Sequence, residues 1–142
     1  MTARPPNAIL GIDHLVLRVV DIEKMVRFYT QALGCTVERE RPDLGLIHLR
    51  AGRSQIDLVR IDGPLGSKGG AAPGRQGRNL DHFCLRVEAL DPEALRRQLA
   101  PFGVEPEEAK VRFGADGMGP SIYLSDPEGN MVELKGPPVP KG

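Results

Sequence analysis

The sequence of 142 residues contains no Trp, only four Phe and two Tyr, and equal numbers of basic and acidic residues, 19 of each. A net charge of zero provides no global positive field to attract nucleic acid or an anionic membrane. So few aromatic rings disfavour a platform for stacking single-stranded bases. No apolar run approaches the roughly 20 residues of a membrane span. We therefore expect no nucleic acid and no membrane among the partners.

Cysteine is also scarce. Cys35 and Cys84 are the only two, which is too few for a disulfide framework, and we expect both to be reduced. Residues 1–6 carry no hydrophobic signal core, which favours a cytoplasmic protein. The length suits one domain that needs neither a disulfide nor a structural metal to fold. The 17 Gly and 13 Pro favour many short elements joined by turns.

The sequence contains an internal repeat. Residues 12–19 read Ile-Asp-His-Leu-Val-Leu-Arg-Val, and residues 80–87 read Leu-Asp-His-Phe-Cys-Leu-Arg-Val. Each copy is followed by a helix pattern with an Asp cap, Asp21 in the first and Asp91 in the second. Three strand-like stretches then follow, at about 36–40, 45–50 and 55–61 in the first copy and about 108–113, 120–125 and 131–135 in the second. Each copy is therefore predicted to be a βαβββ module in a single α+β domain.

The predicted domain has four parts along the chain. Module one covers about 9–62 and module two about 80–136. A glycine-rich connector covers about 63–79, and the tail 137–142, which is rich in Pro, is expected to be frayed.

Strand alternation places an unusual set of polar side chains on one face of each module. Because successive strand residues point to opposite faces, the apolar residues pack on the helix and the others face away. The outward sets are His14, Arg18, His48 and Asp57 in module one, and His82, Arg86, Tyr123 and Glu133 in module two. Two imidazoles and one carboxylate leave open positions on Fe(II), and a fourth oxygen ligand suits Ni, Mn, Co or Zn. Partly solvated histidines duplicated with the module remain an alternative at this point.

The sequence resembles the vicinal oxygen chelate superfamily, which includes glyoxalase I, bleomycin-resistance and fosfomycin-resistance proteins and extradiol dioxygenases. The resemblance rests on the two Asp-His repeats, on Val26-Arg27-Phe28-Tyr29 with Leu33-Gly34, and on the segment 122–134 with its Asp-Pro-Glu-Gly-Asn turn. It covers about 9–136 and implies two βαβββ modules curled into an incomplete β-barrel. It also implies one divalent metal per site and a homodimer that shares its sites between chains.

The resemblance also assigns ligands. His14, His82 and Glu133 match the metal ligands of the superfamily. Glyoxalase I adds a Glu on the last strand of module one, where this sequence has Asp57, one methylene shorter. Asp57 is therefore expected to be a metal ligand, a water-mediated ligand, a base or a spectator.

Three kinds of chemistry follow from the resemblance. A dioxygenase-like enzyme with an Fe(II) triad is the first, with Tyr123 and His48 as further catalytic residues beside Glu133. A glyoxalase- or epimerase-like lyase or isomerase is the second, and a fosfomycin-type thiol transferase is the third. The contrasting hypothesis is a protein that binds a small drug or toxin without catalysis. Arg18 and Arg86 are expected either to bind an anionic substrate or to form internal ion pairs with residues such as Glu133 or Asp57.

Overall fold

The computed structural model describes residues 5–140 and contains the two predicted modules. Module one comprises β1 (His14–Val19), α1 (Ile22–Arg27), β2 (Thr36–Arg41), β3 (Leu46–Ala51) and β4 (Ser54–Arg60). Module two comprises β5 (Phe83–Arg86), α2 (Pro92–Leu99), β6 (Lys110–Gly114), β7 (Gly117–Ser125) and β8 (Met131–Lys135). The α+β prediction is thus confirmed.

Each module forms one four-stranded mixed sheet with the same topology. The strand orders are β1-β4-β3-β2 and β5-β8-β7-β6, with the first strand of each module parallel to the last. The two sheets are open and separate, so each presents its first strand as a free edge. Short helical turns, Pro42–Leu44, Gly66–Gly69 and Ala100–Phe102, complete the regular structure in the described range.

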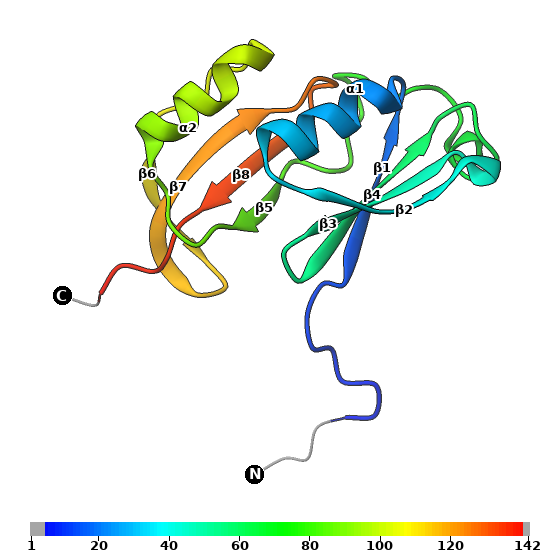
Figure 1. Cartoon of the computed structure of the whole chain (residues 1–142). Helices are drawn as coiled ribbons and strands as arrows, with labels where there is room; N and C mark the ends of the chain where they lie inside the picture. The colour runs from blue at the N-terminus through cyan, green and yellow to red at the C-terminus, as the bar shows by residue number, and fades with distance from the viewer. Residues whose placement is uncertain (1–4, 141–142) are drawn as a thin grey trace.

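Alternation along the strands separates core from surface as the sequence predicts. In β1, Leu17 and Val19 are buried, whereas Val16 is 50% exposed on the opposite face. Figure 1 shows both helices on one side of the two sheets. The inner faces and helices share a single core, whose largest fully buried side chains are Tyr29, Phe28, Met25, Leu49, Ile56, Leu58, Leu99, Ile122 and Leu124. The outward faces are thus left for polar chemistry.

The helices begin where the sequence places their caps. The side chain of Asp21 accepts a hydrogen bond from the Lys24 amide, and Asp91 does the same for Ala94. The first helix differs from the regular pattern in its last turn, which widens into a π-helix over Phe28–Ala32. Gly34 follows with φ of 82°, a left-handed conformation in which glycine carries no steric penalty.

The Asp-Pro-Glu-Gly-Asn turn joins the two modules. Buried Asp126 accepts a hydrogen bond of 2.7 Å from the hydroxyl of Tyr29 in module one. The Glu128 carboxylate accepts hydrogen bonds from the backbone amides of Val20 and Asp21, between β1 and α1. A turn read from the sequence as a local hairpin is therefore also the main polar contact between the halves.

The connector is held near both of its ends. The Arg18 guanidinium donates to the carbonyl oxygens of Gly66, Gly70 and Ala71 at 2.6–3.2 Å. Arg78, near the second end, donates to the Asn130 side-chain oxygen and the Glu128 carbonyl oxygen at 3.4 Å. Every residue of 71–80 is exposed. In the predicted frayed tail, the Val139 amide donates to the Met118 carbonyl. Residues 141–142 of the tail and residues 1–4 lie outside the described range. Within residues 5–140 no helix is both long and apolar enough to cross a membrane.

Candidate active site

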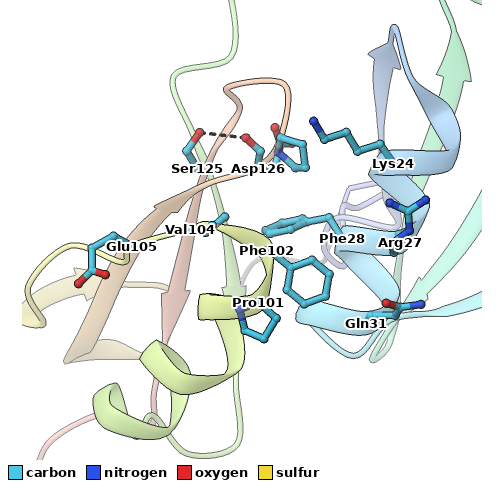
Figure 2. A pocket seen from close by; sticks show the side chains of 12 residues that line it. Lys24, Arg27, Phe28, Gln31, Pro101, Phe102, Val104, Glu105, Ser125 and Asp126 are labelled. Atoms are coloured by element: carbon cyan, nitrogen blue, oxygen red, sulfur yellow. Dashed lines mark hydrogen bonds between the residues drawn. The ribbon is translucent and has the colours of Figure 1, made fainter.

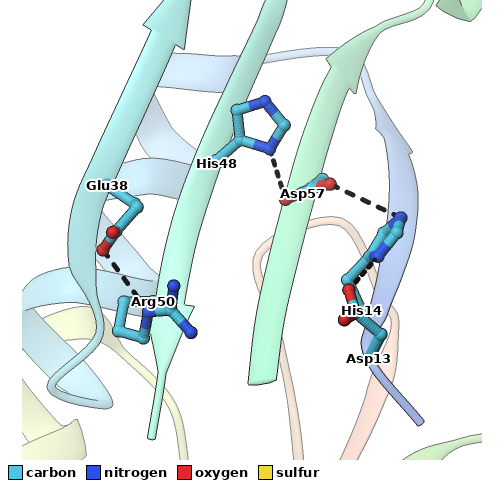
Figure 3. Close-up of polar contacts among 6 residues, drawn as sticks. All are labelled: Asp13, His14, Glu38, His48, Arg50 and Asp57. Carbon is cyan, nitrogen blue, oxygen red and sulfur yellow. Dashed lines mark hydrogen bonds and ion pairs between the residues drawn. The ribbon is translucent and has the colours of Figure 1, made fainter. Parts of the chain in front are cut away.

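Module one holds a carboxylate between two imidazoles (Figure 3). Asp57 on β4 is only 4% exposed, and its Oδ1 lies 2.9 Å from Nδ1 of His48 on β3. Its other oxygen, Oδ2, lies 3.9 Å from Nε2 of His14 on β1. The register explains the arrangement, because Asp57 pairs directly with His48 on one neighbour and with Val16 on the other. Three of the predicted site residues therefore come together on one face of this sheet.

Module two repeats the plan with different residues. Nε2 of His82 lies 3.2 Å from Oε1 of Glu133, which is 5% exposed on β8. Tyr123, the cross-strand partner of Glu133, packs its ring edge-on against His82 with centroids 5.1 Å apart. Its hydroxyl lies 3.5 Å from Nε2 of His82. Burial, with a further contribution from the charge of Glu133, raises the pKa of Tyr123, so the phenol is a proton donor at neutral pH.

The aspartates that precede the two histidines orient the imidazoles. Nδ1 of His14 lies 2.6 Å from Oδ1 of Asp13, and Nδ1 of His82 lies 2.7 Å from Oδ2 of Asp81. An ionised carboxylate only accepts, so Nδ1 carries the proton in each ring and Nε2 is left with a lone pair. The hydrogen bond to Asp13, assisted by the charge of Asp57, raises the pKa of His14. Each Nε2 is thus presented to its carboxylate, as in histidines that ligate metals.

The four predicted ligands form two pairs and not one cluster. Among residues 5–140, no three His, Cys, Asp or Glu side chains gather closely enough to hold a metal ion. Each pair offers one imidazole nitrogen and carboxylate oxygens, which are the donors that borderline divalent cations take. The residues therefore fit a divalent ion as two half-sites. On the same face, desolvation and then the charge of Glu133 raise the pKa of the Cys84 thiol to about 11.

The two arginines expected at the site are engaged elsewhere. Arg18 binds the connector carbonyls, and Arg86 pairs with Asp116 at 3.2 Å. Neither forms an ion pair with Asp57 or Glu133 in the described structure. Sequence reasoning missed a third arginine, Arg112 on β6, whose guanidinium carbon lies 4.6 Å from the centroid of the Tyr123 ring. The only sequence signal for Arg112 was its position in the strand alternation of β6.

Two cavities are found among the described residues. One, of about 1160 Å³, is lined by both modules and includes Cys84, Arg86 and Asp116 from the outward face of module two. The other, of about 630 Å³, lies between the first helix and residues 101–105, with Phe28 and Phe102 at its base and Lys24 and Arg27 on its rim (Figure 2). Neither cavity is lined by a histidine, by Asp57 or by Glu133, so we assign the chemistry to neither of them.

Comparison of the sequence with known families gives a match. The model of the Glyoxalase/Bleomycin resistance protein/Dioxygenase superfamily matches residues 11–134. The chain belongs to this superfamily. The superfamily joins glyoxalases and dioxygenases with bleomycin resistance proteins, so membership alone does not decide the reaction.

Relatives span several activities. Mitochondrial methylmalonyl-CoA epimerase of Bos taurus is 28% identical over 133 residues, covering 87% of this chain and 73% of the relative. Virulence protein STM3117 of Salmonella typhimurium is 30% identical over 127 residues, covering 87% of this chain and 81% of that protein. The crystal structure of STM3117 superimposes with a TM-score of 0.71, covering 91% of this chain and 98% of the crystallised one.

Proposed function

We propose that this protein is a divalent-metal enzyme that moves a proton next to a carbonyl group of a small molecule with vicinal oxygens. The observation that carries the proposal is the Asp57–His48 pair beside His14. A buried carboxylate with one oxygen held by an imidazole is suited to act as a base, because the second oxygen has only the longer contact of 3.9 Å to His14 and the imidazole of His48 connects the carboxylate to solvent. The similarity to methylmalonyl-CoA epimerases supports an isomerase.

The roles follow from the two half-sites. His14, His82 and Glu133 would hold the ion, and Lewis-acid stabilisation of developing negative charge on the substrate oxygen is the chemistry that a divalent ion supplies. Asp57 Oδ2 takes the proton from the carbon next to the carbonyl, and the electron pair of the broken bond moves into the carbonyl to give an enolate. Return of the proton to a different face or carbon completes an epimerisation or isomerisation. His48 fixes Asp57 through Oδ1.

A complete ligand set requires a second copy of the chain. Within one chain the half-sites stay apart, so we propose a homodimer in which His14 and Asp57 of one copy face His82 and Glu133 of the partner subunit. The segment before β1 supports this arrangement. It extends away from the two sheets (Figure 1), and in it Leu10 is 90% exposed and Ile12 is 81% exposed. Such apolar exposure beside a half-site is typical of a surface that a partner covers.

Elemental analysis and proton exchange test the proposal together. Untagged protein purified without chelator should carry about one divalent ion per chain, and Glu133→Ala should lose it. Asp57→Asn should keep the ion, yet slow exchange of the α-proton of methylmalonyl-CoA in D₂O by about 100-fold or more, followed by ¹H NMR. The matched control is Asp62→Asn, an exposed aspartate just after β4. Metal-free protein after anaerobic reconstitution with each ion would refute the proposal.

The dimer has its own test. Light scattering should give twice the chain mass for the natural protein, and Leu10→Asp together with Ile12→Asp should shift it toward the monomer. Val37→Asp is the control, because Val37 is also exposed, at 45%, but lies on β2 at the far edge of the sheet from β1.

A ring-cleaving dioxygenase is the second candidate, and Tyr123 favours it. Its neutral hydroxyl lies 3.5 Å from His82, in reach of a substrate oxygen bound beside the metal ligands. Oxygen uptake with catechol in iron-loaded protein, lost in Tyr123→Phe, would select this reaction over proton transfer.

A further inference from the structure

Arg112 lies on the same face of module two as the His82–Glu133 pair. It is on β6, directly opposite Gly119 on β7, and its side chain reaches back along the sheet to Tyr123. Tyr123 in turn contacts His82. A single aromatic ring therefore separates the guanidinium from the imidazole of the half-site.

One edge of the guanidinium is unoccupied. Nη1 donates to the hydroxyl and the carbonyl oxygen of Ser121 at 2.8 and 3.1 Å, which fixes the plane of the group. For Nε and Nη2, no acceptor lies within hydrogen-bonding distance among residues 5–140. This pair of nitrogens forms the planar fork that binds a carboxylate through two parallel hydrogen bonds.

A second cation lies close by. Lys135 is 5% exposed and its ammonium donates to the Gly117 carbonyl at 3.0 Å. A Cβ at Gly119, the cross-strand partner of Arg112, would lie 2.8 Å from Nζ of Lys135, so the two cations flank this glycine. Within residues 5–140 neither cation has a carboxylate partner. Two positive charges without counter-ions favour an anion here, despite the nearby charge of Glu133.

Arg18 and Arg86, the other two arginines of the outward faces, are not free to bind a ligand anion. Three backbone carbonyls of the connector occupy Arg18, and the carboxylate of Asp116 occupies Arg86. A ligand anion would have to displace an existing partner at either residue, whereas Arg112 is already oriented and open.

We infer that Arg112 binds a carboxylate group of the substrate through Nε and Nη2, with Lys135 adding to the positive potential. The inference rests on the proposed function and narrows its substrate class. The substrate is a small carboxylate whose vicinal oxygens reach the metal half-site, one aromatic-ring width away. Tyr123 forms the wall between the two groups and its face packs against the guanidinium.

A pair of probes that differ only in a carboxylate tests this in protein reconstituted with Co(II). Catechol presents vicinal oxygens alone, and 3,4-dihydroxybenzoate adds a carboxylate across the ring. The visible spectrum of the cobalt reports binding of each. We expect the carboxylate to tighten binding by about 10- to 100-fold, the effect of charge-assisted hydrogen bonds. Arg112→Gln should abolish that gain and leave catechol affinity unchanged, and Arg112→Lys should keep only part of it.

Controls separate this inference from the metal proposal. Arg96→Gln, on an exposed ion-paired arginine of α2, should leave the gain intact. A gain that survives Arg112→Gln, or that disappears in Arg86→Gln instead, would overturn the assignment, as would equal affinity for both probes in the natural protein. Near-UV circular dichroism verifies that each variant is folded. If Arg112→Gln does not fold, the affinities measured for Arg112→Lys test the assignment instead.

A second measurement needs no metal. Saturation-transfer NMR of metal-free protein should detect benzoate but not its neutral analogue benzamide, and the benzoate signal should vanish in Arg112→Gln. If the protein takes up no Co(II), the proposed function fails while this measurement still decides the role of Arg112. Benzoate binding that is unchanged in the variant, or undetectable in the natural protein, would refute that role.

Discussion

The hydrogen bond between Tyr29 and Asp126 is the clearest place to test how the two halves are held together. Tyr29 is fully buried, and its hydroxyl donates to an ionised carboxylate at 2.7 Å across the module boundary. Tyr29→Phe removes the donor and keeps the ring, so no cavity larger than the hydroxyl arises. A hydrogen bond to a charged acceptor contributes about 2 kcal/mol. For a chain of 142 residues, this corresponds to a melting temperature about 6 °C lower.

The same hydrogen bond should also affect how the stability of the protein depends on pH. Burial, followed by the charge of Asp126, raises the pKa of Tyr29 well above its ordinary value. The folded phenol therefore keeps its proton where the unfolded phenol loses it, and stability falls as the pH rises above about 10. By pH 11 this loss amounts to about 1.4 kcal/mol in the natural protein and is absent from Tyr29→Phe. The stability gap between the two should narrow accordingly.

Thermal unfolding followed by circular dichroism, at one fixed protein concentration, measures both effects. Tyr123→Phe is the control, because that ring is only partly buried and the contact of its hydroxyl with His82 is long, at 3.5 Å. A melting temperature of Tyr29→Phe within about 2 °C of the natural protein would show that the bond contributes little. If the difference in stability between the natural protein and Tyr29→Phe stays constant between pH 9 and pH 11, the raised pKa of Tyr29 does not contribute to stability as described.

Two further predictions concern the backbone near the module boundary. Gly66→Ala should lower the free energy of unfolding by about 2 kcal/mol or more, because the new Cβ would lie 1.9 Å from the carbonyl oxygen of Arg60. Gly74 has open space around it, so the control Gly74→Ala should change the melting temperature little. Glu128→Ala should speed hydrogen exchange at the Val20 and Asp21 amides by about tenfold, since each loses its carboxylate acceptor; unchanged exchange would mean that water replaces the carboxylate without loss.

Much of the fold could be read from the sequence because its determinants are local. The repeated Asp-His strands, the Asp caps and the alternation of apolar residues each act within a few positions, and every predicted element is present. The differences are at the ends: β1 begins at His14 and β5 at Phe83, two to three residues later than the repeats suggest. Before β1 a hydrogen bond from the Gln55 amide on β4 to the Asp13 carbonyl oxygen still continues the pairing, although Asp13 lies outside the strand.

The sites depend on contacts that no local pattern contains. Alternation places His14, His48 and Asp57 on one face, and the structure brings them together as pairs. Whether Arg18 would face a ligand or the connector was not decided by its strand position, because the competing acceptors are carbonyls some fifty residues away. For the same reason, the sequence did not single out Arg112. Its proposed role depends on which of its hydrogen-bond donors have no partner, and that is decided by Ser121 across the hairpin.

The connector bears on how the chain itself could be divided. Arg18 holds the part up to Ala71, Arg78 contacts the Glu128–Asn130 turn, and the stretch 71–80 is exposed throughout. The Tyr29 hydroxyl and the Glu128 carboxylate, by contrast, link the halves without any covalent bond between them. Two separately produced fragments, cut near Gly74, should therefore find each other and rebuild the native molecule. The peptide link between the two modules would then not be required for the native structure to assemble.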